Sequence, residues 1–355
     1  MRGIVSLADE TMCVRDAHRF DVAGLEHWLN ANVDGFSGPL AIRQFAGGQS
    51  NPTFLLTSRD RRYVLRKKPP GKLLPSAHQV DREYRVMKAL AATDVPVPPM
   101  ICLCDDASVI GTTFYVMTFV EGRIFRDLEL TGSSKSERAR VYDSMNESLT
   151  RLHRVDPAAI GLEDFGKPGN YFERQLGRWT KQYRGAETEK IVSMELLIEW
   201  LPANIPPDDS SAIAHGDYRL ENSIYHASEP RMIAILDWEL STIGHPLADL
   251  AYNCMPYHLV NPSIGGLVGT DFEASGIPTE SEYVARYCER TGRVGIENWD
   301  FYIAFAIFRL ASISQGVYKR GLDGNASSAE ATTFKDICRL LADIAWSKLE
   351  TSGQA

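Results

Sequence analysis

Strand-like and helix-like patterns occupy different parts of this chain, and this segregation constrains its fold more than any other feature of the sequence. Three short runs rich in β-branched and aromatic residues, PLAIRQF, PTFLLTS and RRYVLRK, fall within residues 39–67, and a Gly-Gly turn and a polar turn separate them. A stretch with helical periodicity, SAHQVDREYRVMKAL, follows, and then two more strand-like runs, MICLC and FYVMTF. The first 120 residues or so therefore predict the order β-β-β-α-β-β.

The pattern becomes mainly helical after Gly122. The first long helix expected there begins with Ser134 and Glu137, which have the spacing of a capping box. A chain of 355 residues is longer than one core usually serves, so we expect two lobes with a cleft between them. The predicted fold class is α+β, with an N-terminal extension and helix at 1–37, a small mixed β lobe at 38–119 and a larger helical lobe at 120–355.

Composition excludes several classes of function. The net charge is −8 and no basic stretch is long enough for a nucleic-acid surface. The N-terminal residues include acids where a signal peptide would need an apolar core, and no run approaches the roughly 18 apolar residues of a membrane span. The six scattered cysteines suggest buried free thiols in a reduced cytoplasm. The expected partner is a small molecule, with no nucleic acid or membrane, and a homodimer is left open.

The stretch AIAHGDYRLEN places Asp217 and Asn222 five positions apart. This is the spacing of the catalytic loop of kinases, in which the Asp accepts the proton of the attacked hydroxyl and the Asn holds Mg²⁺. Arg219 could neutralise charge on the transferred phosphoryl group. His215 is expected to order the loop rather than to take part in chemistry.

A second acidic centre follows an apolar run, MIAILD, which predicts a strand that ends near Asp237. A carboxylate delivered there can hold Mg²⁺ against the β- and γ-phosphates of a nucleotide. Glu239 is close enough in sequence to assist, or to order water around the metal. Asp249, in GHPLADLAY, is expected to cap a helix or to brace the catalytic loop.

The N-terminal lobe has positions suited to a nucleotide. The turn FAGGQSN lies where a phosphate-covering loop is expected, although Gly-Gly is also an ordinary hairpin turn. In YVLRKK an Arg stands where kinases usually have Lys, and a Glu of the next helix would pair with it, whereas the adjacent lysines fit a solvated strand end. The segment FYVMTFVEG would offer backbone groups to adenine. The predicted cofactor-binding residues are Gly47, Gly48, Ser50, Asn51, Arg66, Glu83, Thr118, Phe119 and Val120.

The stretches HGDYRLEN and ILDWELSTIGHPLADLAY, behind a strand-rich N-terminal part, resemble the aminoglycoside phosphotransferase family, whose fold is that of the protein kinases. The resemblance runs from about residue 38 to residue 340. It implies that Asp217 is the catalytic base, that Asn222 and Asp237 hold Mg²⁺, and that ATP binds between the lobes.

A narrower resemblance involves YVLRKKPPGKLLPSAHQVDREYRVMKAL and RQLGRWTKQY, which look like the kinase-like domain of some acyl-CoA dehydrogenase family members. It implies phosphorylation of the hydroxyl of a hydroxyacyl-CoA. The chain departs from the protein kinases, because it has no G-x-G-x-x-G and has Arg66 where Lys is usual, which changes the reach of the cation. Only 12 positions separate Asp237 from Asp249, which leaves no room for an activation segment, so a protein substrate is not expected.

The insert KPGNYFERQLGRWTKQYRGAET is expected to be helical and to wall the acceptor site. Its cations favour an anionic acceptor, although cations on a helix face are often simply solvated. The predicted acceptor residues are Arg174, Arg178, Trp179, Gln182 and Tyr183.

The leading functional hypothesis is an ATP- and Mg²⁺-dependent phosphotransferase acting on a hydroxyacyl-CoA. One alternative is an aminoglycoside or other small-metabolite O-kinase. Another is a nucleotide-binding scaffold without turnover, for which the Arg at position 66 is the one favourable feature.

Overall fold

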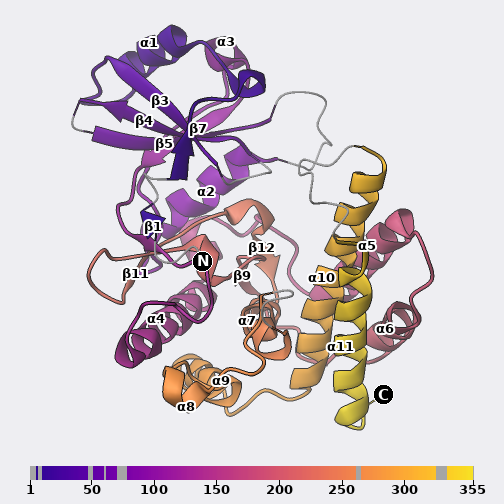
Figure 1. The fold of residues 1–355 in the computed structure, drawn as a ribbon. Helices are drawn as coiled ribbons and strands as arrows, with labels where there is room; N and C mark the ends of the chain where they lie inside the picture. The colour runs from indigo at the N-terminus through magenta and orange to yellow at the C-terminus, as the bar shows by residue number, and fades with distance from the viewer. Residues whose placement is uncertain are drawn as a thin grey trace. The chain divides into compact units, whose positions relative to one another are not determined.

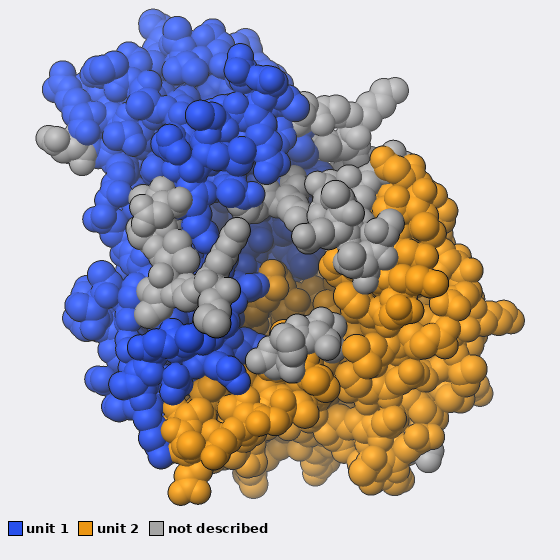
Figure 2. Space-filling view, in the orientation of Figure 1, with its two compact units in different colours: residues 1–148, 158–162, 220–241 blue, residues 149–157, 163–219, 242–355 orange. Residues whose placement is uncertain are grey.

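The computed structural model divides into two compact units, coloured blue and orange in Figure 2. Unit 1 comprises residues 1–148, 158–162 and 220–241, and unit 2 comprises residues 149–157, 163–219 and 242–355. The structure describes residues 5–6, 10–46, 51–59, 61–69, 78–260, 265–324 and 334–354.

A six-stranded antiparallel sheet dominates unit 1 (Figure 1). Residues alternate between its two faces along each strand, so that Phe54 and Leu65 pack into a core that includes Leu25 of the first helix. Val64 and Arg66 point to the opposite face, where a cavity lies. In spatial order the strands are β2 Thr11–Met12, β3 Leu40–Phe45, β4 Thr53–Ser58, β5 Arg61–Lys67, β7 Phe114–Thr118 and β6 Met100–Cys104.

Helices cover both faces of this sheet. Asp21 caps the first of them, because its carboxylate accepts a hydrogen bond from the amide of Gly24 at 3.0 Å, as its position before the helix predicts. The helices α1 and α3 pack on one face, and α2 contacts β6 and β7 from the other. Their bounds are α1 Val22–Asn32, α2 Val80–Leu90 and α3 Ala107–Ile110.

A second, four-stranded sheet completes unit 1 and draws together segments that are far apart in the sequence. Its strands, in spatial order, are β1 Val5–Ser6, β8 Arg123–Ile124, β10 Ser223–Tyr225 and β11 Met232–Ile235. The turns η4 Leu220–Asn222 and η5 Trp238–Leu240 flank β10 and β11. Helix α4, Lys135–Arg154, begins in unit 1 and ends in unit 2, and the amide of Glu137 donates to Ser134 Oγ at its start, as predicted.

Unit 2 is mainly helical. Its centre is α10, which packs against α5, α6, α7 and α11, and Figure 1 shows α10 and α11 side by side. By length and composition α10 could span a membrane, but 78% of its apolar window is buried within the protein, as expected of a core helix. The helices of unit 2 are α5 Tyr171–Ala186, α6 Val192–Ala203, α7 Pro246–Cys254, α8 Phe272–Ser275, α9 Glu280–Thr291, α10 Trp299–Leu322 and α11 Ile337–Thr351. Its strands are β9 Ala212–Ala214 and β12 Thr242–Gly244, and its short turn is η6 Met255–His258. Unit 1 has two further short turns, η2 Asp16–His18 and η3 Ala158–Ile160.

The predicted strands and helix are present as β3, β4, β5, α2, β6 and β7, but the two-residue strands β1 and β2 and the short helix α3 were not predicted. The remainder is mainly helical, as predicted, and also contains the short strands β8 to β12. The compact units do not follow a single cut at residue 120, because the segment 220–241 pairs with β8 and so belongs with the N-terminal sheets. The lobe boundary at 119/120 stays a prediction. All six cysteines are free, but the expected burial is wrong for Cys13, which is exposed, and incomplete for Cys102.

Candidate active site

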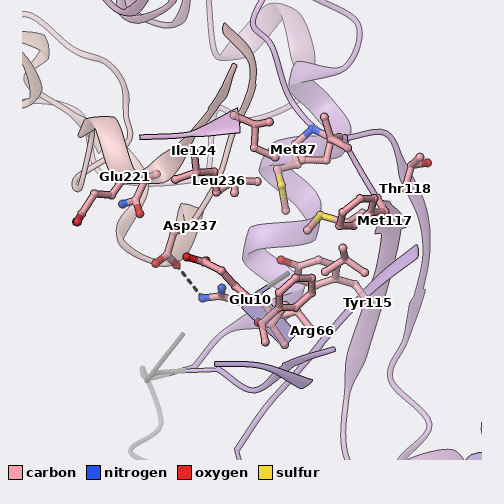
Figure 3. Close-up of a pocket in the computed structure, with 18 of the residues that line it drawn as sticks. Glu10, Arg66, Met87, Tyr115, Met117, Thr118, Ile124, Glu221, Leu236 and Asp237 are labelled. Carbon is pink, nitrogen blue, oxygen red and sulfur yellow. Dashed lines mark hydrogen bonds and ion pairs between the residues drawn. The ribbon is translucent and has the colours of Figure 1, made fainter. Parts of the chain in front are cut away.

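A cavity in unit 1 lies beside the face of the six-stranded sheet that carries Arg66 (Figure 3). Its apolar wall combines side chains from the sheet, from α2 and from the second sheet, namely Val64, Met87, Met117, Ile124, Ile224 and Leu236. Its polar lining includes Arg66, Asn222 and Asp237. Apolar walls with a few convergent polar groups are the usual form of a small-molecule site.

Arg66 of β5 connects three acidic side chains. Its Nε lies 3.0 Å from Oε2 of Glu83, and its Nη2 lies 2.7 Å from Oδ1 of Asp237 and 3.4 Å from Oε2 of Glu239. The predicted pairing of Arg66 with Glu83 is therefore confirmed, and the contact with Asp237, drawn as the dashed line in Figure 3, is additional. Burial would lower the pKa of Arg66, but the carboxylates of Glu83 and Asp237 raise it well above its ordinary value. The single positive charge of Arg66 faces the three acidic side chains of Glu83, Asp237 and Glu239. The local charge is therefore negative, and the site favours the binding of a further cation.

Glu83 is held in place from the strands around it. It is 1% exposed, and its carboxylate accepts hydrogen bonds from Tyr115 Oη at 3.1 Å and from Asn51 Nδ2 at 2.8 Å. Asn51, which the sequence predicts as a nucleotide contact, is itself buried and also lies 3.0 Å from Nδ1 of His78. The structure therefore gives the Asn51 side chain a bracing role. Gly47, Gly48 and Ser50 lie outside the described residues.

Asp237 has a backbone conformation that its sequence position does not reveal. Its φ and ψ are 64° and 61°, the left-handed region that side chains other than glycine seldom adopt. The next residue, Trp238, is 1% exposed and donates from Nε1 to the carbonyl of Ile235 at 3.0 Å, which anchors the turn. Such conformations persist where the surrounding structure imposes them, and they concentrate at functional sites.

Asn222 and Asp237 come together because β10 and β11 pair. The amide of Leu236 donates to the carbonyl of Asn222 at 2.8 Å, so Asp237 follows directly after a residue bonded to Asn222. Within the described part of the chain, no group of three or more His, Cys, Asp and Glu side chains could hold a metal ion alone. The donors still suit Mg²⁺, which proteins usually hold through one or two carboxylates together with substrate phosphates.

Thr118, Phe119 and Val120, whose backbone groups are predicted to meet adenine, line the same cavity, but these backbone groups differ in availability. The amide of Thr118 donates to the carbonyl of Pro99 at 2.9 Å, and the amide of Phe119 donates to that of Arg62 at 3.2 Å. No hydrogen bond of the Val120 amide to another described residue is found. Of the three predicted residues, Val120 therefore has the N–H best placed to meet a ligand.

Residues 215–219 of the expected catalytic loop belong to unit 2, and Asp249 of α7 braces them. This is one of the two roles predicted for Asp249; the other, capping a helix, is taken at α7 by His245. The carboxylate of Asp249 accepts hydrogen bonds from the amides of His215 at 2.5 Å and Gly216 at 2.8 Å. Burial would raise the pKa of Asp249, but the hydrogen bonds from His153 and the Gly216 amide hold it below its usual value. His215 orders the loop, since its Nδ1 accepts from the amide of Asp217 at 3.2 Å.

Asp217 itself is reached by two side chains of unit 2. Arg219 Nε lies 3.5 Å from its Oδ2, and the hydroxyl of Tyr252 forms a hydrogen bond with it. The predicted pair Asp217 and Arg219 is thus close together. The division between the units falls between Arg219 and Leu220, so Asn222 and Asp237 are described with unit 1.

The acceptor residues predicted on α5 separate onto different faces. Trp179 and Tyr183 are 5% and 0% exposed and continue the buried stripe of Phe172 and Leu176, so they pack in the core of unit 2. The other three predicted residues, Arg174, Arg178 and Gln182, are exposed. Arg174 donates to the carbonyls of Lys167 and Gly169 just before the helix, and Arg178 stacks on Trp179. The role of all five residues toward an acceptor stays a prediction.

Sequence reasoning missed three side chains that contact the catalytic loop. Asn253 donates from Nδ2 to the carbonyl of Tyr218, the hydroxyl of Tyr252 bonds to the side chain of Asp217, and Arg309 donates to the carbonyl of Gly216. Helical spacing could have found Tyr252 and Asn253, because they stand three and four positions after Asp249. Arg309 interrupts the apolar run FYIAFAIFRLASI, which is a signal of a functional cation in a core helix.

Comparison with known proteins identifies the family. The profile of the phosphotransferase enzyme family matches residues 41–285. The chain belongs to this family. Members act as phosphotransferases, and this assignment confirms the predicted class of enzyme.

Relatives of this phosphotransferase are found among larger proteins. It is 47% identical over 339 residues to acyl-CoA dehydrogenase family member 10 of Mus musculus, and 46% identical over 334 residues to acyl-CoA dehydrogenase family member 11 of Homo sapiens. These matches cover 95% and 92% of this chain but only 32% and 43% of the relatives, so the chain spans less than half of their length.

Solved structures confirm the predicted kinase-like fold. A protein of Ralstonia eutropha, described as a candidate aminoglycoside phosphotransferase, is 50% identical with a TM-score of 0.87, and the match covers 94% of this chain and 99% of that one. The aminoglycoside phosphotransferase APH(4)-Ia, in ternary complex with ADP and hygromycin B, has a TM-score of 0.59 at 13% identity, over 92% and 98% of the two chains. The second likeness carries the fold alone.

Proposed function

We propose that this phosphotransferase transfers the γ-phosphoryl group of ATP to the hydroxyl of a hydroxyacyl-CoA. The observation that carries the proposal is the identity of 46–47% with acyl-CoA dehydrogenase family members along more than nine-tenths of this chain. A phosphotransferase region within proteins named for acyl-CoA chemistry is expected to act on the same class of thioester.

The cavity of unit 1 supports ATP as the phosphoryl donor. Its apolar walls suit adenine, and the amide of Val120 is available to a ring nitrogen. The polar lining of Arg66 and Asp237 suits the phosphates. Asp237 and Asn222 would hold Mg²⁺, with Glu239 nearby, and this ion when bound neutralises phosphate charge.

Asp217 would act as the general base. Its carboxylate accepts the proton of the acceptor hydroxyl as the new bond from oxygen to the γ-phosphorus forms and the bond from that phosphorus to the ADP oxygen breaks. Arg219, 3.5 Å from Asp217, would offset the developing negative charge. A base that is already positioned contributes about 10²–10⁴-fold to such a transfer.

An aminoglycoside is the second candidate acceptor, and the Ralstonia eutropha protein with its 50% identity favours it. The two candidates differ in charge, since aminoglycosides are cations and acyl-CoA is an anion. The exposed cations of α5, Arg174 and Arg178, favour the anion.

The test is ADP release measured by a coupled assay, with Mg-ATP and matched acceptors. A hydroxyacyl-CoA is compared with the same acyl-CoA lacking the hydroxyl, with free CoA, and with kanamycin, hygromycin B and spectinomycin. We expect turnover with the hydroxyacyl-CoA alone and a phosphate monoester in the ³¹P spectrum of the product. Turnover with the antibiotics alone would reverse the assignment, and a thermal shift with Mg-ATP but no product from any acceptor would favour a scaffold.

We propose a reduced cytoplasm as the location. All six cysteines are free, and Cys102 and Cys104 lie on one strand without forming a bridge. Fractionation of the source cells, followed by immunodetection of this chain, tests the assignment.

A further inference from the structure

Arg309 is a buried cation that no carboxylate of the described residues neutralises. It lies on α10, is 6% exposed, and forms no ion pair with a described acidic side chain. Its guanidinium instead lies over two aromatic rings, with Cζ 5.4 Å from the centroid of Trp179 and 5.0 Å from that of Tyr252. Burying a charge without a carboxylate partner is unfavourable, and Arg309 Nε is buried without a hydrogen-bond partner in the part of the chain that the structure describes, so contacts with two rings alone explain this residue poorly.

The guanidinium is directed at the catalytic loop. Arg309 Nη2 donates to the carbonyl of Gly216, the residue before Asp217. The amide of Gly216 donates to Asp249, so one glycine is held on its amide side by an anion and on its carbonyl side by a cation. Gly216 has a φ of +81°, which other residues rarely adopt, and the two contacts stabilise this turn.

Tyr252 extends the same arrangement to the carboxylate. Its ring lies against Arg309, and its hydroxyl forms a hydrogen bond with the side chain of Asp217. Burial, followed by the nearby charge of Asp217, raises the pKa of Tyr252 well above its ordinary value, so the hydroxyl stays protonated and acts as the donor.

Helix α7 presents these contacts from one face. Asp249, Tyr252 and Asn253 stand at positions i, i+3 and i+4 and contact, respectively, the amides of residues 215 and 216, the carboxylate of Asp217 and the carbonyl of Tyr218. Arg309 adds a contact from α10. The loop is therefore fixed on both sides of Asp217.

We infer that Tyr252 and Arg309 are positioning residues for Asp217: Arg309 sets the Gly216 peptide and the Tyr252 ring, and Tyr252 sets the rotation of the carboxylate. The inference rests on the proposed role of Asp217 as the base. Fixing the carboxylate matters because a misplacement of about 1 Å in a reacting group costs about 10²-fold in rate.

The experiment compares Y252F, R309K and R309M with Y302F, which removes the hydroxyl of another buried tyrosine of unit 2. We expect Y252F to lower kcat about tenfold or more and R309M about 100-fold, with KM for ATP within about twofold of the wild-type value. R309K should fall between them, because an ammonium can donate to the Gly216 carbonyl but is not a plane that can stack on an aromatic ring. Y302F should retain at least about half of the wild-type kcat, which calibrates the effect of removing any buried hydroxyl.

A double-mutant cycle separates positioning from general weakening of the fold. If Tyr252 acts through Asp217, then Y252F should leave the residual rate of D217N unchanged, because the carboxylate that it orients is already gone. A further tenfold fall in the double variant would overturn the inference. So would a Y252F enzyme with more than half of the wild-type kcat, and this conservative variant decides the question even if R309M does not fold.

Amide hydrogen exchange tests the positioning without any acceptor. In Y252F and R309K the peptide covering residues 214–219 should exchange about tenfold faster than in wild type, whereas the peptide covering 100–118 of unit 1 should be unchanged. If the wild-type protein releases no ADP with any acceptor, the proposed function fails. The positioning part is then judged by exchange alone, and unchanged exchange in both variants would refute it.

Discussion

Replacing Arg66 by lysine tests whether the planar guanidinium, rather than its charge alone, is required. The structure shows one side chain joining two elements, because Nε meets Glu83 of α2 and Nη2 meets Asp237 beyond β11. A lysine at this position carries a single ammonium on a flexible stem and can keep only one of these two contacts. The usual kinase lysine is therefore expected to be a poor substitute in this chain.

The magnitude follows from the contact that is lost. One hydrogen bond to a charged group contributes about 1.5–3 kcal/mol, so R66K should destabilise the protein by about 2 kcal/mol. For a unit of this size that corresponds to a fall of roughly 4–8 °C in Tm. R66M should cost about 3–5 kcal/mol, because Glu83 would remain buried without its cation.

The assay is thermal unfolding of the metal-free and nucleotide-free protein, followed by titration with Mg-ATP. The matched control is R62K, on the same strand, because Arg62 pairs with Glu121 at the surface, where the side chains are 33% and 73% exposed. Such an exposed pair contributes less than about 1 kcal/mol. If R66K unfolds within about 1 °C of wild type, or no earlier than R62K, the bridging role of Arg66 is wrong.

Three further changes follow from the same geometry. D217N should lower kcat by about 10²–10⁴-fold and leave the Kd of Mg-ATP nearly unchanged; full turnover would exclude Asp217 as the base. D237A should weaken Mg-ATP binding at least about tenfold in calorimetry, since its carboxylate is the charged oxygen ligand proposed for the metal; an unchanged Kd contradicts that assignment. Burial lowers the pKa of His245 from 6.5 to about 4, so the stability that its neutral ring contributes is fully present above pH 6.5 and is lost as the pH falls toward 4. Its Nδ1 caps α7 by accepting from the amide of Leu247, and urea unfolding should show about 2 kcal/mol less stability at pH 5 than at pH 7, a difference that H245Q should reduce.

Local patterns in the sequence were sufficient for most of the elements and for the loop that carries Asp217. Runs rich in β-branched and aromatic residues identified the strands of the six-stranded sheet apart from the two-residue β2, and a period near 3.6 identified the long helices, because this period reflects which face of a helix is buried. The pair of Arg66 with Glu83 also followed, and for Asp249 the sequence narrowed the role to two, of which the structure shows the bracing of the loop.

The tertiary structure decided what depends on contacts between distant segments. Arg309 reaches a loop 93 positions earlier in the chain, and Asp237 adopts a left-handed backbone because Trp238 is anchored behind it. Trp179 has the same aromatic character whether it walls an acceptor site or packs in a core, and only its burial against α10 distinguishes the two. Periodicity reports which face of a helix is apolar, but the packing of the whole chain selects what that face meets.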